Sequence, residues 1–224
     1  RPLMFAADKK VKVDRSKVYD FYILGLIAGS YFPGGAMKGA KVLVNREFVR
    51  AFPGGLGEAK TAANYAASLW PQAQAEKLGC DQVLYLDALK HDYIDELGGM
   101  NFFMVRNGRL ITPSLNGAIL NGVTRRSILE IAPQLKLEAR EEKISFSELK
   151  AGIESGAVTE AFACGTAAVV SPLGEIVYQE SLQQSAPQSL KLPAQFPVAT
   201  KISELLKAIQ RGAAPAPGDW LLRV

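Results

Sequence analysis

Apolar residues recur at helical spacing in four stretches of the chain, and each stretch predicts a helix with one buried face. Gly79 follows the first stretch and is suited to end a helix, and Ser145 precedes the third and is suited to cap it. The four predicted helices span residues 64–78, 122–135, 146–155 and 199–211.

Short apolar or alternating runs between these stretches are typical of strands. The run 18–28 predicts a buried strand, Asn107-Gly108 predicts a tight hairpin turn, and the polar, proline-containing stretch 181–197 predicts a loop. The other predicted strands are residues 41–46, 82–87, 100–105, 110–112, 137–144, 158–163, 167–171 and 175–180. Because strands and helices follow one another without a regular βαβ order, the pattern favours an α+β domain over a doubly wound sheet.

The length of the chain limits the number of domains. Its 224 residues, 48% of them hydrophobic, suit one globular domain with a sizeable core, or one domain plus part of another. Residues 29–39 hold four glycines and Pro33, which predicts a linker. The chain begins Arg1-Pro2, without an initiator methionine, and we interpret it as part of a longer protein.

Charge and cysteine content exclude several classes of protein. The net charge is +4, and the 26 basic and 22 acidic residues are scattered, so a nucleic-acid partner is not expected. The longest apolar stretch, 21–32, is too short to span a membrane. Cys80 and Cys164 form no CxxC pair, which fits a reducing, cytoplasmic compartment, and no cluster has the spacing of metal ligands.

A first candidate for chemistry is Lys60, which lies among small residues that would let a bulky flat ring approach the backbone. Tyr65, five residues further on, could reach the same ring. Taken alone, Lys60 is more typical of a solvated lysine near a helix start than of a catalytic one. The stretch 54–61 also resembles a phosphate-binding P-loop, but Ala59 replaces the glycine that should precede the lysine.

Three further segments could serve the same ligand. Glu96, before Gly98-Gly99, is either a surface charge or a buried partner for a cation. The segment 120–126 opens a helix whose free N–H groups and Thr124 hydroxyl could bind a phosphate, although it could also be an ordinary capped helix with solvated arginines. The small residues of 163–168 could offer amides and a hydroxyl to an anion, or form a simple tight turn.

In this order, the four segments closely resemble the class IV, or D-amino-acid-transaminase-like, pyridoxal-phosphate enzymes, and the similarity covers nearly the whole chain. Within that family the chain is most similar to the branched-chain amino acid aminotransferases. Their lysine segment is matched by Lys60, Ala62, Ala63, Asn64, Tyr65, Ser68 and Leu69. The family signature is matched at Glu96, Asn101, Phe102, Phe103, Leu110, Thr112, Leu120, Gly122 and Arg125, and further segments at 79–83, 98–101, 122–125 and 164–167.

The resemblance implies a role for each matching residue. Lys60 would be the Schiff-base lysine and the proton carrier, Tyr65 would bond the ring hydroxyl, and Glu96 would hold the pyridine nitrogen. The remaining cofactor-binding residues would be Leu120, Gly122, Val123, Thr124 and Thr166. The substrate-binding residues would be Arg1, Tyr31, Gly99, Thr166 and Ala167. Asn121 departs from the proline usual in the family, which affects only the rigidity of that turn.

The resemblance also implies the fold, the domains and the reaction. Residues 40–224 would form the large pyridoxal-phosphate-binding domain of the D-amino-acid-aminotransferase-like fold, residues 29–39 the linker, and residues 1–28 the tail of a smaller N-terminal α/β domain. The enzyme would move amino groups between leucine, isoleucine or valine and 2-oxoglutarate by a ping-pong mechanism. A homodimer with the site near the interface is expected.

Three alternatives remain at this point. D-amino acid transaminases and aminodeoxychorismate lyases look similar around the signature, although Asn64-Tyr65 and the run 98–100 favour the branched-chain enzymes. The chain could also be an inactive cofactor-binding fragment, because a site without a complete small domain would be open to water.

Overall fold

The computed structural model describes residues 1–27, 37–179 and 186–221. The chain divides into two compact units, Arg1–Ser30 and Tyr31–Val224. Most of the predicted linker, including Tyr31, lies outside the described residues.

The first unit is a hairpin of two antiparallel strands, β1 (Pro2–Ala6) and β2 (Tyr19–Ile23). The prediction of a buried strand at 18–28 is wrong for this unit, since four of the five residues of β2 are exposed. The physical reason is that, among the described residues, β2 pairs only with β1, and a two-stranded sheet has no second layer to bury its faces. Phe5 and Tyr22 stack across the two strands with their ring centroids 5.8 Å apart.

A mixed nine-stranded sheet forms the centre of the second unit, as far as the structure describes it. Its strands are β3 (Ala40–Asn45), β4 (Gln82–Leu86), β5 (Ile94–Leu97), β6 (Asn101–Arg106), β7 (Arg109–Pro113), β8 (Ala139–Glu142), β9 (Val158–Gly165), β10 (Val169–Tyr178) and β11 (Gln188–Lys191). The strand order is β11-β10-β3-β4-β5-β6-β7-β8, and β9 pairs with both β10 and β6, so six of the strands close a ring. Parallel and antiparallel pairs are mixed, and the prediction of an α+β fold is confirmed.

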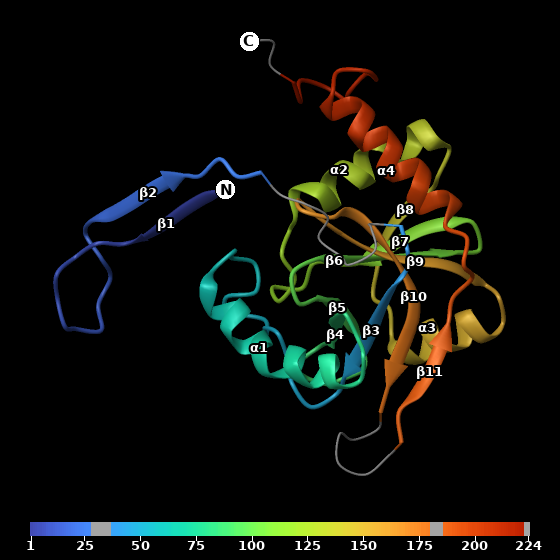
Figure 1. Cartoon of the computed structure of the whole chain (residues 1–224), viewed down its shortest axis with the longest axis horizontal. Helices are drawn as coiled ribbons and strands as arrows, with labels where there is room; N and C mark the ends of the chain where they lie inside the picture. Colours follow the sequence, from blue (N-terminus) through green and yellow to red (C-terminus); the bar gives the residue numbers. More distant parts are fainter. Residues whose placement is uncertain (28–36, 180–185, 222–224) are drawn as a thin grey trace. The chain divides into compact units, whose positions relative to one another are not determined.

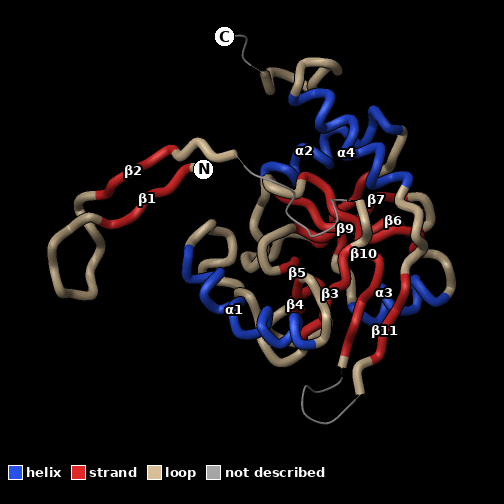
Figure 2. Tube along the Cα trace, viewed as in Figure 1, coloured by secondary structure: helices blue, strands red, loops and turns tan. Residues whose placement is uncertain are grey.

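Among the described residues, four α-helices lie outside this sheet: α1 (Ala62–Lys77), α2 (Val123–Ile131), α3 (Phe146–Glu154) and α4 (Pro197–Gln210) (Figure 2). Each matches a predicted helix, and Ser145 caps α3 in a reciprocal capping box with Glu148, as expected. The second predicted helix is shorter than expected, because the chain tightens at Ala132 into a 3₁₀ turn, Ala132–Leu135. Pro133 has no N–H to continue the α-helical ladder.

Two strand predictions need correction. The separate strands expected at 167–171 and 175–180 form one long strand, β10, because Pro172 and Gly174 fall where its pairing shifts from β9 to β3. The loop expected at 181–197 contains β11, which pairs antiparallel with the end of β10. The short strands β1 and β5 were not predicted at all.

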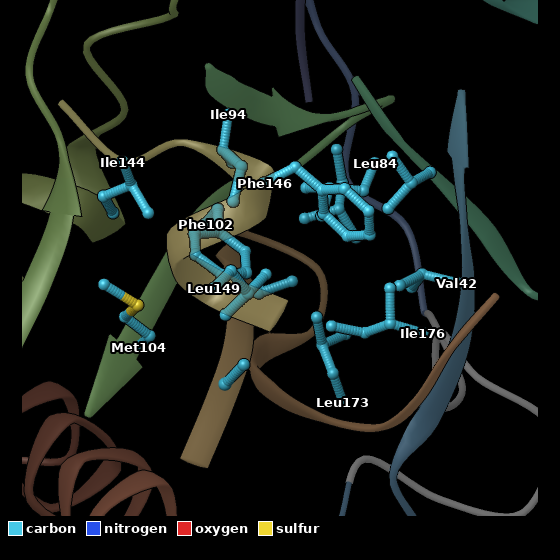
Figure 3. Packing of buried hydrophobic residues seen from close by; sticks show 14 of the residues in the cluster. Val42, Leu84, Ile94, Phe102, Met104, Ile144, Phe146, Leu149, Leu173 and Ile176 are labelled. Atoms are coloured by element: carbon cyan, nitrogen blue, oxygen red, sulfur yellow. The ribbon is translucent and has the colours of Figure 1, made fainter. Parts of the chain in front are cut away.

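The core lies on both faces of the ring. Phe102 and Met104 of β6 point to one side, where they join Phe146 and Leu149 of α3 (Figure 3). The alternate residues of β6 point to the other side and pack with α2 and α4, which lie side by side (Figure 1). This double burial explains why residues 102–105 of β6 are all apolar rather than alternating.

None of the described helices is long and apolar enough to cross a lipid bilayer.

Candidate active site

One pocket of about 190 Å³ brings together residues from all four segments identified in the sequence. Its lining comes from Lys60, from the turn between β5 and β6, from the loop entering α2, and from the turn between β9 and β10. The lining residues are Lys60, Glu96, Gly99, Met100, Asn101, Leu120, Asn121, Gly122, Val123, Thr124, Cys164, Gly165 and Thr166. A second pocket of about 170 Å³ is lined by Tyr93, Asp95 and Asn116 among others. Of the described residues, none that the sequence predicted for the site lines this second pocket.

Lys60 stands immediately before α1, and its amine is directed at Tyr65 in the first turn of that helix. The Lys60 Nζ donates a hydrogen bond to the Tyr65 hydroxyl over 2.8 Å. Asn64 is buried and donates from its side chain to the carbonyls of Leu56 (2.7 Å) and Ala59 (2.8 Å), so it fixes the loop that carries the lysine. The lysine itself is exposed and open to a reagent in the pocket.

The last glycine of the glycine-rich loop before Lys60 is tightly packed. Gly57 is buried, and a Cβ placed there would lie 2.2 Å from the carbonyl oxygen of Ala118. Only glycine lets the two loops approach this closely. The lysine loop is therefore held directly against the loop that leads to α2.

Glu96 is a buried carboxylate with three hydrogen-bond donors around it. Its Oε1 accepts from the backbone N–H of Leu120 (3.0 Å) and from the guanidinium of Arg50, and its Oε2 accepts from the Asn101 amide (2.7 Å). Burial raises the pKa of Glu96 to about 7, while Arg50 and the Leu120 N–H act in the opposite direction. Of the two readings of Glu96, the structure supports the buried partner of a cation.

Arg50 is the residue of this site that the sequence reasoning missed. Its side chain is buried, and one guanidinium nitrogen contacts Glu96 and the carbonyls of Gly57 (3.2 Å) and Ala118 (3.0 Å). It thereby ties the lysine loop, β5 and the loop before α2 to one another. The surrounding sequence, 46–52, carries no motif or period that would have marked this arginine.

The N-terminus of α2 faces the pocket without a side chain to cap it. Gly122 is its N-cap residue, and Val123 and Thr124 follow in the first turn. The first N–H groups of a helix have no partner within the helix, and the helix dipole places partial positive charge there. This end of the pocket is suited to a phosphate or a carboxylate.

Arg125, on the same helix, is not solvated as the simple capped-helix reading held. Only 2% of it is exposed, and it donates to the carbonyl of Pro113 (2.9 Å) and pairs with Glu141. It holds α2 against β7 and β8 rather than offering a charge to the pocket.

The remaining predicted residues differ in where they lie. Gly99 and Thr166 line the pocket, whereas Ala167 is exposed beside Thr166 and is not among the lining residues. Arg1 belongs to the first unit, so its part in the site stays a prediction. Tyr31 lies outside the described residues. The turn that carries Thr166 leads into Val169, whose φ of 58° is unusual for a β-branched residue.

The charge and shape of this pocket define what it can hold. Its lining offers a lysine amine, a buried carboxylate and an open helix N-terminus, and the Tyr65 hydroxyl lies 2.8 Å from the lysine amine. A flat molecule with a carbonyl group, a basic ring nitrogen and a phosphate would meet a complementary group at each end. Among the described residues, no cluster of three or more His, Cys, Asp or Glu side chains is suited to a metal ion.

Comparison with known proteins gives concordant matches. Residues 26–176 match the model of the amino-transferase class IV family. A probable branched-chain-amino-acid aminotransferase of Streptomyces coelicolor is 43% identical over 99% of this chain, which spans 59% of that relative's length.

Two solved structures are similar in fold. The branched-chain amino acid aminotransferase of Escherichia coli matches with a TM-score of 0.79 and 26% identity, over 98% of this chain and 67% of that one. The branched-chain amino acid aminotransferase of Thermobaculum terrenum, solved in its PLP (holo) form, matches with a TM-score of 0.62 and 25% identity, over 79% of this chain and 52% of that one.

Proposed function

The chain belongs to the class IV aminotransferase family, and from that premise we propose that it is the cofactor-binding part of a pyridoxal-phosphate-dependent branched-chain amino acid transaminase. The observation that carries the proposal is the convergence of Lys60, the buried Glu96 and the open N-terminus of α2 on one pocket. The substrate class rests on the relatives, which are named as enzymes of branched-chain amino acids.

The residues of the pocket fit pyridoxal phosphate group by group. Lys60 would hold the cofactor covalently through its Nζ, and the Tyr65 hydroxyl lies 2.8 Å from that atom, where it could bond the ring oxygen. Glu96 would bind the protonated ring nitrogen. Gly122, Val123 and Thr124 would bind the phosphate through amides and a hydroxyl, with Thr166 and Leu120 completing the lining.

When bound, the cofactor supplies a conjugated ring that accepts the electron pair left when the substrate loses its Cα proton. The chain's own residues do the rest. The free Lys60 amine would act as a base that takes a proton from one carbon and returns it to another. Its hydrogen bond to Tyr65 orients the amine.

Glu96 stabilises positive charge at the far end of the ring. Burial disfavours its ionised form and raises its pKa to about 7. A cation on the ring nitrogen would favour the carboxylate, and the carboxylate would favour the cation, because each neutralises the other and Glu96 is buried. Arg50 keeps the carboxylate in place but is not itself directed to the ring in our proposal.

We extend the proposal to the whole protein. Residues 40–224 would form the large domain, residues 29–39 the linker and residues 1–28 the tail of the small domain, with Arg1, Tyr31, Gly99, Thr166 and Ala167 on the substrate side. The second substrate would be 2-oxoglutarate, and the working form a homodimer. The free thiols of Cys80 and Cys164 support a reducing, cytoplasmic compartment.

The test is an absorption spectrum of the purified protein with pyridoxal phosphate, repeated with Lys60→Ala and with Lys201→Ala as a matched control on the exposed face of α4. We expect a near-ultraviolet or visible band that survives dialysis in the wild type and the control and disappears in Lys60→Ala. No retained band in a folded wild-type sample would end the transaminase proposal.

The substrate class is tested separately, by amino transfer from L-leucine and from D-alanine and by pyruvate release from aminodeoxychorismate. Transfer from L-leucine supports our reading. Transfer from D-alanine, or release of pyruvate, would move the chain to another activity of the same family. A cofactor band without any turnover would favour the inactive-fragment alternative.

A further inference from the structure

Asn101 connects the two ends of the candidate active site through a single side chain. It is 95% buried and directly opposite Glu96 in the hairpin of β5 and β6. Its amide nitrogen donates to Glu96 Oε2 over 2.7 Å and to the carbonyl oxygen of Leu120 over 2.8 Å. A primary amide carries two N–H donors on one atom and no charge, so both acceptors can be served at once.

The peptide of Leu120 is thereby fixed from both sides. Its N–H donates to Glu96 Oε1 (3.0 Å), and its carbonyl accepts from Asn101 and from the N–H of Gly122 (2.8 Å). Gly122 is the N-cap of α2, so the position of this peptide sets where the first amides of the helix point. The Leu120 backbone therefore fixes the position of the Glu96 carboxylate relative to the N-terminus of α2.

The packing of Gly122 against the same side chain supports this coupling. A Cβ on Gly122 would lie 2.3 Å from the Asn101 Oδ1, a distance that real Cβ atoms do not adopt. Gly122 has φ −63° and ψ 141°, a conformation open to any residue. The glycine is therefore needed for close approach to Asn101 rather than for its backbone angles.

From these contacts we propose that Asn101 is a positioning residue that couples the charge state of Glu96 to the geometry of the phosphate-binding end of α2. The inference rests on the proposed function, because it assigns the two ends of the pocket to the ring nitrogen and the phosphate. The amide stabilises the ionised form of Glu96 by donating to it, and the same nitrogen holds Leu120 in place. Loss of this one group disturbs both ends together.

The experiment compares Asn101→Ala with Thr112→Val. Thr112 is also buried and donates from its side chain to a backbone carbonyl, that of Phe102 (2.7 Å), but this hydrogen bond involves neither Glu96 nor Leu120. Three quantities are measured for each protein: the unfolding midpoint, the affinity for pyridoxal phosphate and for inorganic phosphate, and the ionisation midpoint of Glu96. The last is followed by NMR of ¹³C-labelled glutamate carboxyls and assigned with Glu96→Gln.

We expect both variants to lower the unfolding midpoint. Only Asn101→Ala should also weaken the binding of inorganic phosphate about tenfold and raise the ionisation midpoint of Glu96 by about one pH unit. A change of this size is expected when one hydrogen bond to a charged group is lost. If Asn101→Ala lowers only the unfolding midpoint, like Thr112→Val, the residue is merely structural and the inference is overturned.

Gly122→Ala tests the same coupling from the N-terminus of α2, and it replaces Asn101→Ala in the experiment if that variant does not fold. Its new methyl group must displace the Asn101 side chain, so the ionisation midpoint of Glu96 should rise although the substitution does not touch the carboxylate. An unchanged Glu96 midpoint in folded Gly122→Ala contradicts the inference. Absence of a Lys60-dependent cofactor band in the wild type is a different result, and it removes the proposed function together with the inference.

Discussion

The helices α2 and α4 pack side by side but differ in what lies at their N-termini, where free N–H groups carry partial positive charge. Both begin without a side-chain cap from their own N-cap residue. At α4 the gap is filled from β9, because the buried carboxylate of Glu160 accepts from the N–H groups of Val198 (2.8 Å) and Ala199 (2.9 Å). At α2 no side-chain cap bond is formed, and the N-terminus lines the pocket with Lys60 and Glu96.

The difference separates a structural helix N-terminus from a functional one. Partial positive charge and free N–H groups at a helix start favour an anion in both cases. Where the protein supplies that anion itself, the helix gains stability and the end is closed. Where it does not, the end remains available to a ligand, which in our account is the phosphate of the cofactor.

The largest expected effect is at α4. Glu160→Ala would leave two N–H groups buried without a partner and should lower the free energy of unfolding by about 3 kcal/mol, as measured by urea denaturation. Ser145→Ala, which removes the cap of α3, is the matched control and should cost about 1 kcal/mol. Equal losses would mean that the buried carboxylate is no better a cap than a serine.

At α2 the matching change is Gly122→Ala, and its main effect should be on binding. The added methyl group collides with Asn101, so overpacking should cost about 2 kcal/mol of stability and displace the first turn of the helix. Binding of inorganic phosphate, measured by competition with pyridoxal phosphate, should weaken about tenfold or more. Phosphate binding as strong as in the wild type would contradict the placement of the anion at this helix.

Asp95 is a buried carboxylate that, unlike Glu160, does not cap a helix N-terminus. Asp95 neighbours Glu96 on β5 and has one donor, the Asn116 amide at 2.8 Å, and burial raises its pKa to about 6. The folded protein therefore holds a proton that the unfolded chain loses near pH 4, and stability falls as the pH rises from about 4 to about 6. Asp95→Asn should remove this slope and gain up to about 2 kcal/mol above pH 6, and nothing at pH 3, in denaturation curves.

Asp87 is the control with the opposite sign. Burial raises its pKa, but four backbone N–H groups, among them those of Lys90 and Tyr93, lower it by more. Its contribution to stability is present at neutral pH and is lost as the pH falls through the lowered pKa. Asp87→Asn should therefore destabilise at pH 7, and a stabilising effect there would contradict the hydrogen bonds described.

The smallest expected effect is that of Thr124→Val, which removes a single hydroxyl from the open helix end. Phosphate should bind about fivefold more weakly, the unfolding midpoint should stay within about 1 °C, and Thr124→Ser should restore binding. A loss of stability without a change in affinity would indicate that the hydroxyl caps the helix instead of binding a ligand.

Local patterns in the sequence predicted the helices, the hairpin turn and most strands of the second unit. The Asn107-Gly108 turn shows why: both residues have positive φ, 51° and 73°, which this dipeptide readily adopts. The long strand β10 was misread because strand pairing overrides the local signal of Pro172 and Gly174. The short β11 was missed because it lies in a polar, proline-containing stretch and is defined by its pairing with β10. Strand 18–28 was misread because apolar sequence alone cannot tell whether a second layer is present to cover it.

The site was predicted as four separate segments, and the structure supplied the links between them. Lys60 and Tyr65 are close in sequence, so their contact could be anticipated. Arg50 and Asn101 act through partners 46 and 19 residues away, Glu96 and Leu120 respectively, and nothing local marks such contacts. Glu160 is similar, since its partners on α4 lie 38 and 39 residues further along the chain.

The most direct test of the central claim is an amide ¹⁵N NMR titration of the protein with pyridoxal phosphate, compared with pyridoxal, which lacks the phosphate. Our account predicts that the amides of Val123 and Thr124 shift with pyridoxal phosphate and far less with pyridoxal, while those of Val198 and Ala199 do not move. Binding of pyridoxal phosphate without any shift at Val123 and Thr124 would show that the open end of α2 does not hold the phosphate.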